Sequence, residues 1–409
     1  MEKNPSKSIN HKLKHNIDSL LSFNCFCLHT HKIKSKLSCF LTQEKHTMCK
    51  WEFYTIILNM LNNLILILSF TLATFVGAMT LYPFYIKLLR KWKAGKTIRS
   101  NTATWEKSEI FSKLHEHKAG TPTMWWGLFL LMMFLMVWLS RVFQKTWITN
   151  YYLWNRQETY IILFWFFSMW LIWLVDDILN IRDVGKVKWL SMRAKMVWLI
   201  LFSAWISYWF YHVLWIDYIN LSPVFGIVHL WRGFPILTFI ATIFIVNAVN
   251  ITDWLDGLAW WLNIFVLITF AVALFISQRY LATTVLWICI STLVAFMFFN
   301  INPAKIFMGD SWAFALGWLI AATAYLLNMS IWIFIPAAIV FLIFIIDLCT
   351  SGLQMFWKKV FHHKLFPIAP FHHYLEYKWI KEYTIVMYLW LIQTILTVTA
   401  IIIIFWQFI

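Results

Sequence analysis

Charged residues and glycine are both scarce in this sequence. Charged side chains make up 13% of the 409 residues, apolar ones make up 61%, and the mean hydropathy is +0.68. Soluble globular proteins carry about 25% charged residues, so this composition excludes a soluble enzyme of this size. It indicates a polytopic helical membrane protein. No Pro/Gly/Ser-rich linker and no internal repeat divides the apolar part of the chain.

Cysteine is also rare, and four of the six cysteines fall in residues 1–50. The remaining two, Cys289 and Cys349, lie in or at the end of apolar runs, so no disulfide framework is expected. Residues 1–50 hold nine Lys and three acidic residues, and they lack the long apolar core of a signal peptide. We expect a polar basic extension here, either disordered or upstream of the true start, followed by a membrane domain over 51–409.

Long apolar runs fill the rest of the chain. Each is long enough to cross a bilayer or to form the core of a crossing helix. We place ten of them at about 54–86, 124–143, 158–175, 195–214, 234–250, 260–277, 281–299, 312–327, 331–349 and 384–408. The expected fold is therefore an all-α polytopic membrane protein with about ten transmembrane helices.

Lys and Arg are distributed unevenly between the connecting loops. The loops after the odd-numbered runs hold 20 of them, and the loops after the even-numbered runs hold 4. By the positive-inside rule, the odd-numbered loops are cytoplasmic and both ends of the membrane domain lie outside.

The same odd-numbered loops carry the residues capable of chemistry. The most prominent stretch is Asn250-Ile-Thr-Asp-Trp-Leu-Asp-Gly-Leu-Ala259, between the fifth and sixth runs. Ionisable groups are costly at a membrane boundary, so two carboxylates there suggest a functional site. The other four loops contribute Lys118 to Thr123, Asp176-Asp177, Asn300 to Asp310, and His372-His373. We interpret this one-sided pattern as an active site facing the cytoplasm.

Five aspartates of these stretches would repel one another without a divalent cation or protonation, namely Asp176, Asp177, Asp253, Asp256 and Asp310. Oxygen-only ligands favour Mg²⁺ or Mn²⁺ over zinc. Magnesium held by one or two carboxylates together with substrate phosphates is typical of phosphoryl transfer, and Lys118 and Lys195 could neutralise phosphate oxygens. Taken singly, each of these carboxylates could instead be a solvated residue at a helix end with no functional role. An ion-coupled carrier is the alternative for the set, although carriers place such groups near the midplane.

From about residue 55 onward, the chain resembles the phospho-N-acetylmuramoyl-pentapeptide transferases. Lys118-Ala-Gly-Thr-Pro-Thr-Met resembles the family's K-x-GTPTM signature, and Asp176-Asp177 match its aspartate pair. The 250–259 stretch resembles N-x-TDGLDGLA. Asn300-x-x-Pro-Ala-x-x-Phe-Met-Gly-Asp310 matches N-x-x-PA-x-x-FMGD, and Pro370-Phe-His-His373 resembles P-x-HHH.

The resemblance implies transfer of phospho-N-acetylmuramoyl-pentapeptide from UDP to undecaprenyl phosphate, which gives lipid I and UMP. It implies a Mg²⁺ cofactor held by Asp310 and Asp253, and catalytic roles for Asp176, Asp177, Asp310, Lys195, His372 and His373. Substrate contacts are implied for Lys118, Thr123, Asn250, Asp253, Asp256, Asn300, Phe307 and Gln354, with Phe307 stacking on the base.

The implied setting is the bacterial inner membrane, with a homodimer as a family expectation and no nucleic-acid partner. The alternative enzyme hypothesis is a sibling transferase that moves N-acetylglucosamine 1-phosphate from UDP to a polyprenyl phosphate. The GTPTM-like and P-x-HH-like motifs disfavour it. The peptide composition of the substrate and the division of roles between Asp176 and Asp177 are left open.

The chain departs from the family pattern in one systematic way, because tryptophan often stands where the family has glycine. Trp254 replaces the first Gly of TDGLDGLA, and the chain has 28 Trp but only 11 Gly. Further examples are Trp125, Trp126, Trp170, Trp173, Trp312 and Trp318. We interpret these tryptophans as glycines encoded by UGA and translated here as Trp; a divergent paralogue is the alternative. Tyr374 and Asn180 also replace a family His and Lys, which leaves individual phosphate contacts open.

Overall fold

The computed structural model describes residues 46–92, 126–145, 152–153, 159, 162–163, 192–222, 224–301, 304–306 and 310–408. The chain divides into two compact units, Met1–Leu66 and Ile67–Ile409. The expected extension over residues 1–50 lies mostly outside the described residues and stays a prediction.

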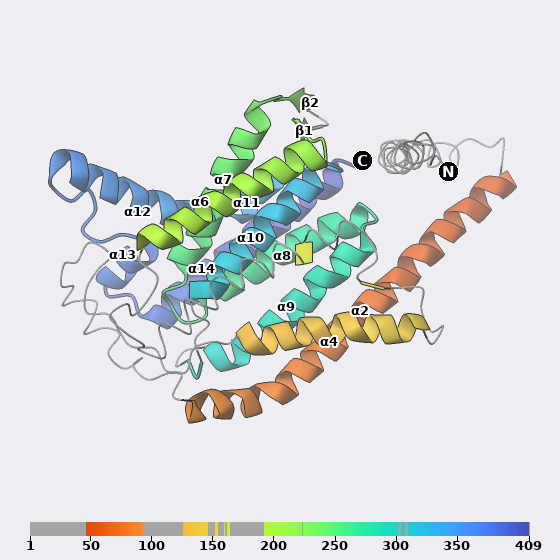
Figure 1. Ribbon diagram of the computed structural model, residues 1–409, viewed down its shortest axis with the longest axis horizontal. Coiled ribbons are helices and arrows are strands. Elements are labelled where there is room, and N and C mark those ends of the chain that lie inside the picture. Colours follow the sequence, from red (N-terminus) through yellow and green to blue (C-terminus); the bar gives the residue numbers. More distant parts are fainter. Residues whose placement is uncertain are drawn as a thin grey trace, which may run out of the picture. The chain divides into compact units, whose positions relative to one another are not determined.

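Helices dominate the described residues, and the only strands among them form a two-stranded antiparallel hairpin. The elements are α2 (His46–Lys91), α4 (Trp126–Lys145), α6 (Met192–Tyr208), the π-helix η2 (Trp209–Val213), β1 (Tyr218–Leu221), β2 (Gly226–His229), α7 (Gly233–Thr252), α8 (Leu258–Ile276), α9 (Tyr280–Asn300), α10 (Asp310–Asn328), α11 (Phe334–Val340), α12 (Leu342–Phe361), α13 (Phe371–Tyr377) and α14 (Glu382–Trp406) (Figure 1).

The long helices coincide with apolar runs of the sequence. Seven of the described helices are long and apolar enough to cross a membrane, and α10 is a shorter apolar helix. Helices suit a membrane because every backbone polar group in the span is satisfied within the segment. The chain is therefore an all-α polytopic membrane protein. The third expected run, 158–175, falls almost entirely outside the described residues, so the count of ten stays a prediction.

The ninth expected run, 331–349, is not one straight helix. It breaks after Val340 into α11 and α12, which are bent by 70°, and α12 continues to Phe361. The break leaves the Val340 carbonyl without a helical partner, and the buried Gln393 side chain of α14 donates to it at 2.8 Å. A broken helix at membrane depth needs such a partner, because lipid offers none.

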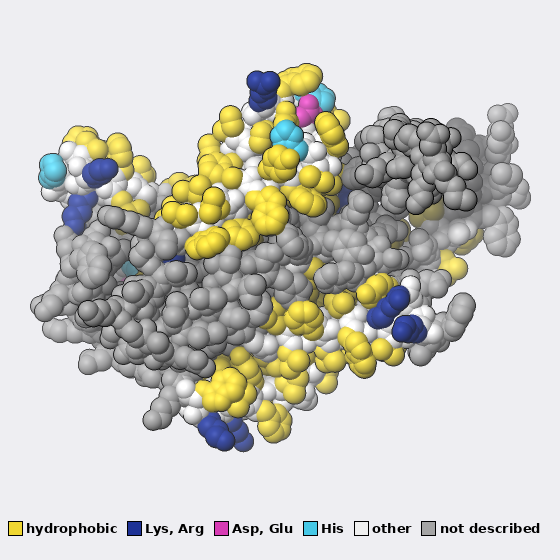
Figure 2. Space-filling view, viewed as in Figure 1, with side chains coloured by type: hydrophobic (Ala, Val, Ile, Leu, Met, Phe, Trp, Pro, Cys, Tyr) yellow, Lys and Arg dark blue, Asp and Glu magenta, His cyan; other side chains and the backbone are white. Residues whose placement is uncertain are grey.

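Large apolar side chains cover much of the described outer surface (Figure 2). On α14, the residues that face outward at helical spacing are Met387, Leu391, Ile395, Val398 and Ile402, and each is more than half exposed. An exposed apolar surface of this extent is expected where side chains face lipid.

The helices α7 and α10 approach each other closely, backbone to backbone. A Cβ on Gly317 would lie 2.7 Å from the Val246 Cα, so only glycine permits this approach. One turn earlier on α7 and two turns later on α10, the Thr242 hydroxyl lies 2.8 Å from the Tyr325 hydroxyl. The earlier residue on α7 (Thr242) contacts the later residue on α10 (Tyr325), so the two helices run antiparallel.

Loops gather at the two ends of the helices. The hairpin end comprises residues 214–232, 277–280 and 328–333. There the Asn328 amide accepts from the Asn220 N–H and donates to the Tyr218 carbonyl, both at 2.9 Å. The carboxylate end comprises residues 250–257, 300–301, 304–306 and 362–382, which include α13 and adjoin the starts of α8 and α14 (Figure 1).

Three tryptophans adopt a backbone conformation that favours glycine. Trp215, Trp231 and Trp379 have φ values of 56°, 50° and 63°, and they are three of the five non-glycine residues with positive φ among those described. A positive φ is a steric outlier for a bulky residue, and the left-handed conformation costs such a residue roughly 1–2 kcal/mol. The three side chains are 81%, 69% and 93% exposed, so burial does not offset this strain. Their backbone conformation supports the glycine hypothesis independently of any motif.

Candidate active site

The loop between α7 and α8 lies at the centre of the carboxylate end. Asp253 caps the C-terminus of α7 and is half-buried, and Asp256 is buried. Gly257 has a φ of +81°, which lets the chain turn directly into α8. The two helices therefore place both carboxylates of the loop within a tight turn.

Asn300, the last residue of α9, holds this loop from the side. Its Oδ1 accepts from the Gly257 N–H at 3.0 Å, and its Nδ2 donates to the Ile306 carbonyl at 2.9 Å. Asn300 is buried, so both bonds are shielded from water. One amide thereby fixes the 253–257 loop to the segment that follows α9.

Glu382, in the first turn of α14, lies outside the sequence motifs but contacts the 253–257 loop. Its Oε1 accepts from the Asp256 N–H at 2.7 Å. An acidic residue at the start of the last apolar run is a signal for a stabilised helix N-terminus, and it could have directed attention here.

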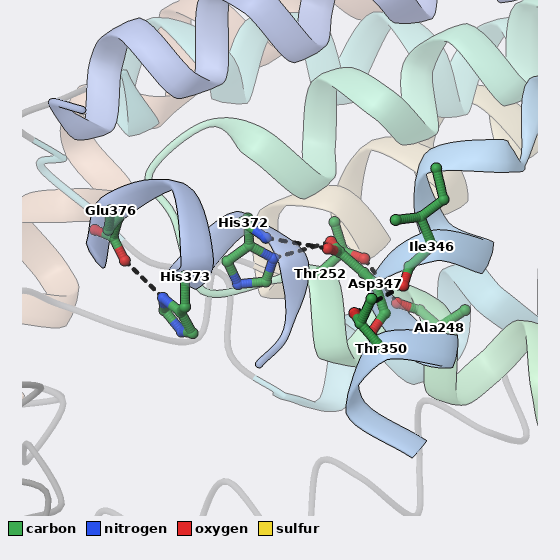
Figure 3. A network of polar contacts seen from close by, with 8 residues as sticks. All are labelled: Ala248, Thr252, Ile346, Asp347, Thr350, His372, His373 and Glu376. Carbon is green, nitrogen blue, oxygen red and sulfur yellow. Dashed lines mark hydrogen bonds and ion pairs between the residues drawn. The ribbon is translucent and has the colours of Figure 1, made fainter. Parts of the chain in front are cut away.

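His372 is completely buried and lies against the carboxylate of Asp347, a second acidic residue outside the sequence motifs. The His372 Nδ1 is 2.9 Å from the Asp347 Oδ2, and the His372 backbone N–H donates to the Asp347 Oδ1 at 3.3 Å (Figure 3). The side chains of His372 and Asp347 are 0% and 1% exposed. An ionisable residue within the apolar run 331–349 was the available signal.

His373 lies beside His372, with ring centroids 4.4 Å apart, and its Nδ1 is 2.6 Å from the Glu376 Oε2. Burial lowers the pKa of His373, and the neighbouring His372 lowers it further, while Glu376 acts in the opposite direction. The Trp254 ring lies 6.0 Å from the His373 ring, edge on. Independently of Trp254, α13 with its two histidines packs against α14, whose Glu382 binds the 253–257 loop.

Gln354 connects α12 to the segment before α13. Its Oε1 accepts from the backbone N–H groups of Leu365 and Phe366, at 3.1 and 2.8 Å. Its Nε2 donates to the Phe366 carbonyl at 3.0 Å. The amide therefore holds the chain that leads into the histidines, and a direct substrate contact by Gln354 stays a prediction.

The start of α10 is level with the 253–257 loop. Thr252 is six residues beyond Val246, and Asp310 is seven residues before Gly317. At a rise of 1.5 Å per residue, both helix ends lie about 10 Å from the Val246–Gly317 contact, in the same direction. The backbone of Asp310 is therefore near Asp253, although the Asp310 side chain lies outside the described residues.

Lys195 is buried in the first turn of α6. Because α6 leads through the hairpin into α7 and packs against it, the first turn of α6 points to the same end as Thr252. Lys118, Thr123, Asp176, Asp177 and Phe307 lie outside the described residues. Within the described part of the chain, no three His, Cys, Asp or Glu side chains converge on a metal position.

Comparison with curated proteins identifies the family. The chain is 31% identical over 310 residues to the phospho-N-acetylmuramoyl-pentapeptide-transferase of Clostridium acetobutylicum, which covers 75% of this chain and 88% of the relative. The chain belongs to this transferase family. The enzyme of the same name from Fervidobacterium nodosum is 31% identical over 321 residues, covering 77% of this chain and 90% of the relative.

The model of Glycosyl transferase family 4 matches residues 159–328. That match contains the 253–257 loop, Asn300 and Asp310. His372, Asp347 and Glu382 lie beyond it, but the pairwise similarity to the pentapeptide transferases covers three quarters of the chain. The family assignment therefore rests on more than the shared central helices.

Proposed function

We propose that this protein transfers phospho-N-acetylmuramoyl-pentapeptide from UDP to undecaprenyl phosphate, which gives lipid I and UMP. One structural observation supports the proposal in addition to the family membership. The 253–257 loop is hydrogen-bonded to Asn300 and to Glu382 of α14, and α13, which carries the two histidines, packs against α14, so these distant parts of the sequence meet at one end of the helices. A membrane enzyme that joins a soluble nucleotide to a lipid phosphate needs such a polar site at the end of its spans.

The described residues divide into two groups within this proposal. Asn250 is half-buried in the last turn of α7, and its side chain forms no hydrogen bond with the other described residues; we assign its amide to the substrate. Asp253 and Asp256 face the uridine diphosphate beside it. Asn300 and Gln354, whose amides bond backbone groups, hold the loops in place.

The remaining assignments follow the motifs. Lys118, Thr123 and Phe307 complete the nucleotide site, with Phe307 on the base. Asp176 or Asp177 orients the lipid phosphate, and Lys195 neutralises phosphate oxygens. His372 and His373 contact phosphate or sugar.

Mg²⁺ fits the donor set at this end. Asp253 is half-buried at the C-terminus of α7, and the backbone of Asp310 starts α10 at the same level. Two carboxylates with substrate phosphates as further ligands are the usual arrangement for this ion. Bound there, it would neutralise charge on the diphosphate; Asp253 and Asp310 are the residues that would hold it.

The carboxylate end faces the cytoplasm of a bacterial cell in this proposal, because its loops belong to the odd-numbered set, which the positive-inside rule assigns to the cytoplasm. The protein would act in the inner membrane, with residues 51–409 as the transferase domain and a homodimer as the assembly.

Donor competition tests the proposed function. The purified full-length protein in nanodiscs is given undecaprenyl phosphate, Mg²⁺ and either UDP-N-acetylmuramoyl-pentapeptide or UDP-N-acetylglucosamine, and UMP is measured. We expect UMP from the pentapeptide donor only, and its loss with EDTA. UMP from UDP-N-acetylglucosamine alone would assign the protein to the sibling reaction.

A further inference from the structure

The Asp347–His372 pair occupies an unusual position. Asp347 lies in the second turn of α12, just after the break, and α12 packs against α7. His372 is the second residue of α13, 25 positions away in sequence. The pair therefore joins the bent helix to the histidine segment of the carboxylate end.

Both oxygens of the Asp347 carboxylate bind the same residue. Oδ1 accepts from the His372 backbone N–H, and Oδ2 faces the His372 Nδ1. His372 is the only hydrogen-bond partner of this carboxylate among the described residues, and none of their Lys or Arg side chains forms an ion pair with it. A carboxylate this deeply buried needs its donors, since an unpaired buried charge costs several kcal/mol.

The carboxylate also determines where the imidazole carries its proton. An ionised carboxylate can only accept, so Nδ1 must be the protonated nitrogen that donates to it. The neutral ring then has its lone pair on Nε2. The Nε2 atom is buried and has no partner among the described residues, and it points away from Asp347 (Figure 3). A buried polar atom without a partner calls for an explanation, and a bound ligand or a catalytic role is one that fits a histidine at this end.

We propose that Asp347 is a positioning residue for the transfer reaction, holding His372 so that Nε2 meets a phosphate oxygen of the substrate. The inference rests on the proposed function, which brings phosphate groups to this end. Nε2 and the phosphate oxygen share one proton, and the Asp347 carboxylate stabilises the imidazolium when that proton resides on the ring. A charged N–H donor binds phosphate about twice as strongly as a neutral one.

Asp347→Asn is the most informative variant, because the amide is nearly isosteric with the carboxylate. Its Oδ1 can still accept from the His372 backbone, but its NH₂ group would face Nδ1 and donate. The ring would then carry its proton on Nε2 and lose access to the imidazolium. We expect kcat for UMP release to fall roughly 10- to 100-fold, by analogy with the loss seen when a carboxylate that orients a metal-ligating histidine is removed.

Two further variants separate positioning from folding. Asp347→Glu restores the carboxylate and should recover most of the activity. Asp217→Asn is the matched control, because Asp217 Oδ1 lies 3.0 Å from the His229 Nδ1 in a partly exposed pair at the hairpin end. That variant should keep wild-type activity.

The tautomer provides a readout that a purely structural role would not change. The full-length enzyme with ¹⁵N-labelled histidine is studied in nanodiscs, and the His372 signal is assigned by its absence from His372→Gln. We expect a protonated Nδ1 in the wild type and in Asp347→Glu, and a protonated Nε2 in Asp347→Asn. An unchanged tautomer in Asp347→Asn, or unchanged kcat in that variant, would overturn the proposal.

The activity of the wild-type enzyme distinguishes a failure of the positioning role from a failure of the proposed function. Wild-type UMP release with full activity in Asp347→Asn would refute the positioning role and leave the transferase function standing. Absence of UMP release from the wild type would refute the proposed function, and the tautomer of His372 would still decide whether Asp347 orients the ring.

Discussion

The Gly257 N–H donates to the Asn300 Oδ1 at 3.0 Å, across the gap between the start of α8 and the end of α9. Asn300 also donates to the Ile306 carbonyl, so a single buried amide holds two loops of the candidate site. The geometry of the 253–257 loop therefore depends on a residue 43 positions later in the chain.

Asn300→Ala should disturb both stability and catalysis. The substitution leaves the buried Gly257 N–H and Ile306 carbonyl without their partner, and each unsatisfied group lowers the stability of the fold by about 1–3 kcal/mol. It also releases the turn that carries Asp253 and Asp256, so kcat/KM for UMP release should fall by at least an order of magnitude. Thermal unfolding and steady-state kinetics measure the two effects.

Asn328→Ala is the control for that variant. Asn328 makes the same pair of bonds at the hairpin end, where its amide joins Asn220 and Tyr218. We expect a similar loss of stability with unchanged kcat per folded enzyme. Equal kinetic losses in the two variants would show that Asn300 acts only through overall stability.

Replacing the left-handed tryptophans by glycine should stabilise the protein. Trp215→Gly, Trp231→Gly and Trp379→Gly each remove a steric strain of about 1–2 kcal/mol, and the lost side chains are mostly exposed. The midpoint of thermal unfolding in detergent should rise for each variant.

Trp357→Gly provides the opposite control. Trp357 lies inside α12, where its ring is 4.2 Å from that of Phe361 and its Nε1 donates to the His363 Nε2. Glycine in a helix interior costs about 1 kcal/mol, and these contacts are lost as well, so stability should fall. A fall in all four variants would contradict the glycine hypothesis.

Peptide mass spectrometry of the protein from its native host tests the hypothesis directly. We expect glycine at positions 254 and 312 and at the three positive-φ positions. Trp312 is completely buried, with its ring 4.3 Å from that of Phe129, so glycine there would remove a large side chain between α4 and α10. Tryptophan at 254 and 312 in native peptides would support a divergent paralogue.

His373 should make stability depend on pH. Its pKa in the folded protein is lowered by burial, whereas the unfolded residue titrates near 6.5. The unfolded state therefore binds more protons below about pH 6.5, and stability is lost as the pH falls from there towards the folded pKa. His373→Gln should show a smaller loss between pH 7 and 5 in thermal unfolding; identical slopes would argue against this.

Much of the candidate site could be predicted from the sequence, because its loops stand out as polar segments between apolar runs. Asn250, Asp253, Asp256, Asn300 and the histidines all fall in such loops. The family resemblance added roles for them, and the structure brings the described ones to one end.

The contacts between these loops could not be predicted. Asp347 lies within an apolar run and meets a partner 25 residues later, which no local spacing reveals. The 70° break after Val340 has no proline or glycine at the break itself and depends on Gln393 of another helix. Long-range partners of this kind decide local geometry only once the helices are packed.

The most direct test of the central claim is the stoichiometry of the two products. Native full-length protein is given UDP-N-acetylmuramoyl-pentapeptide, Mg²⁺ and undecaprenyl phosphate, and both UMP and the lipid-linked product are quantified over time. The account predicts equal amounts of UMP and lipid I, and neither product without undecaprenyl phosphate. UMP release that does not require the lipid phosphate, or no release at all, would contradict it.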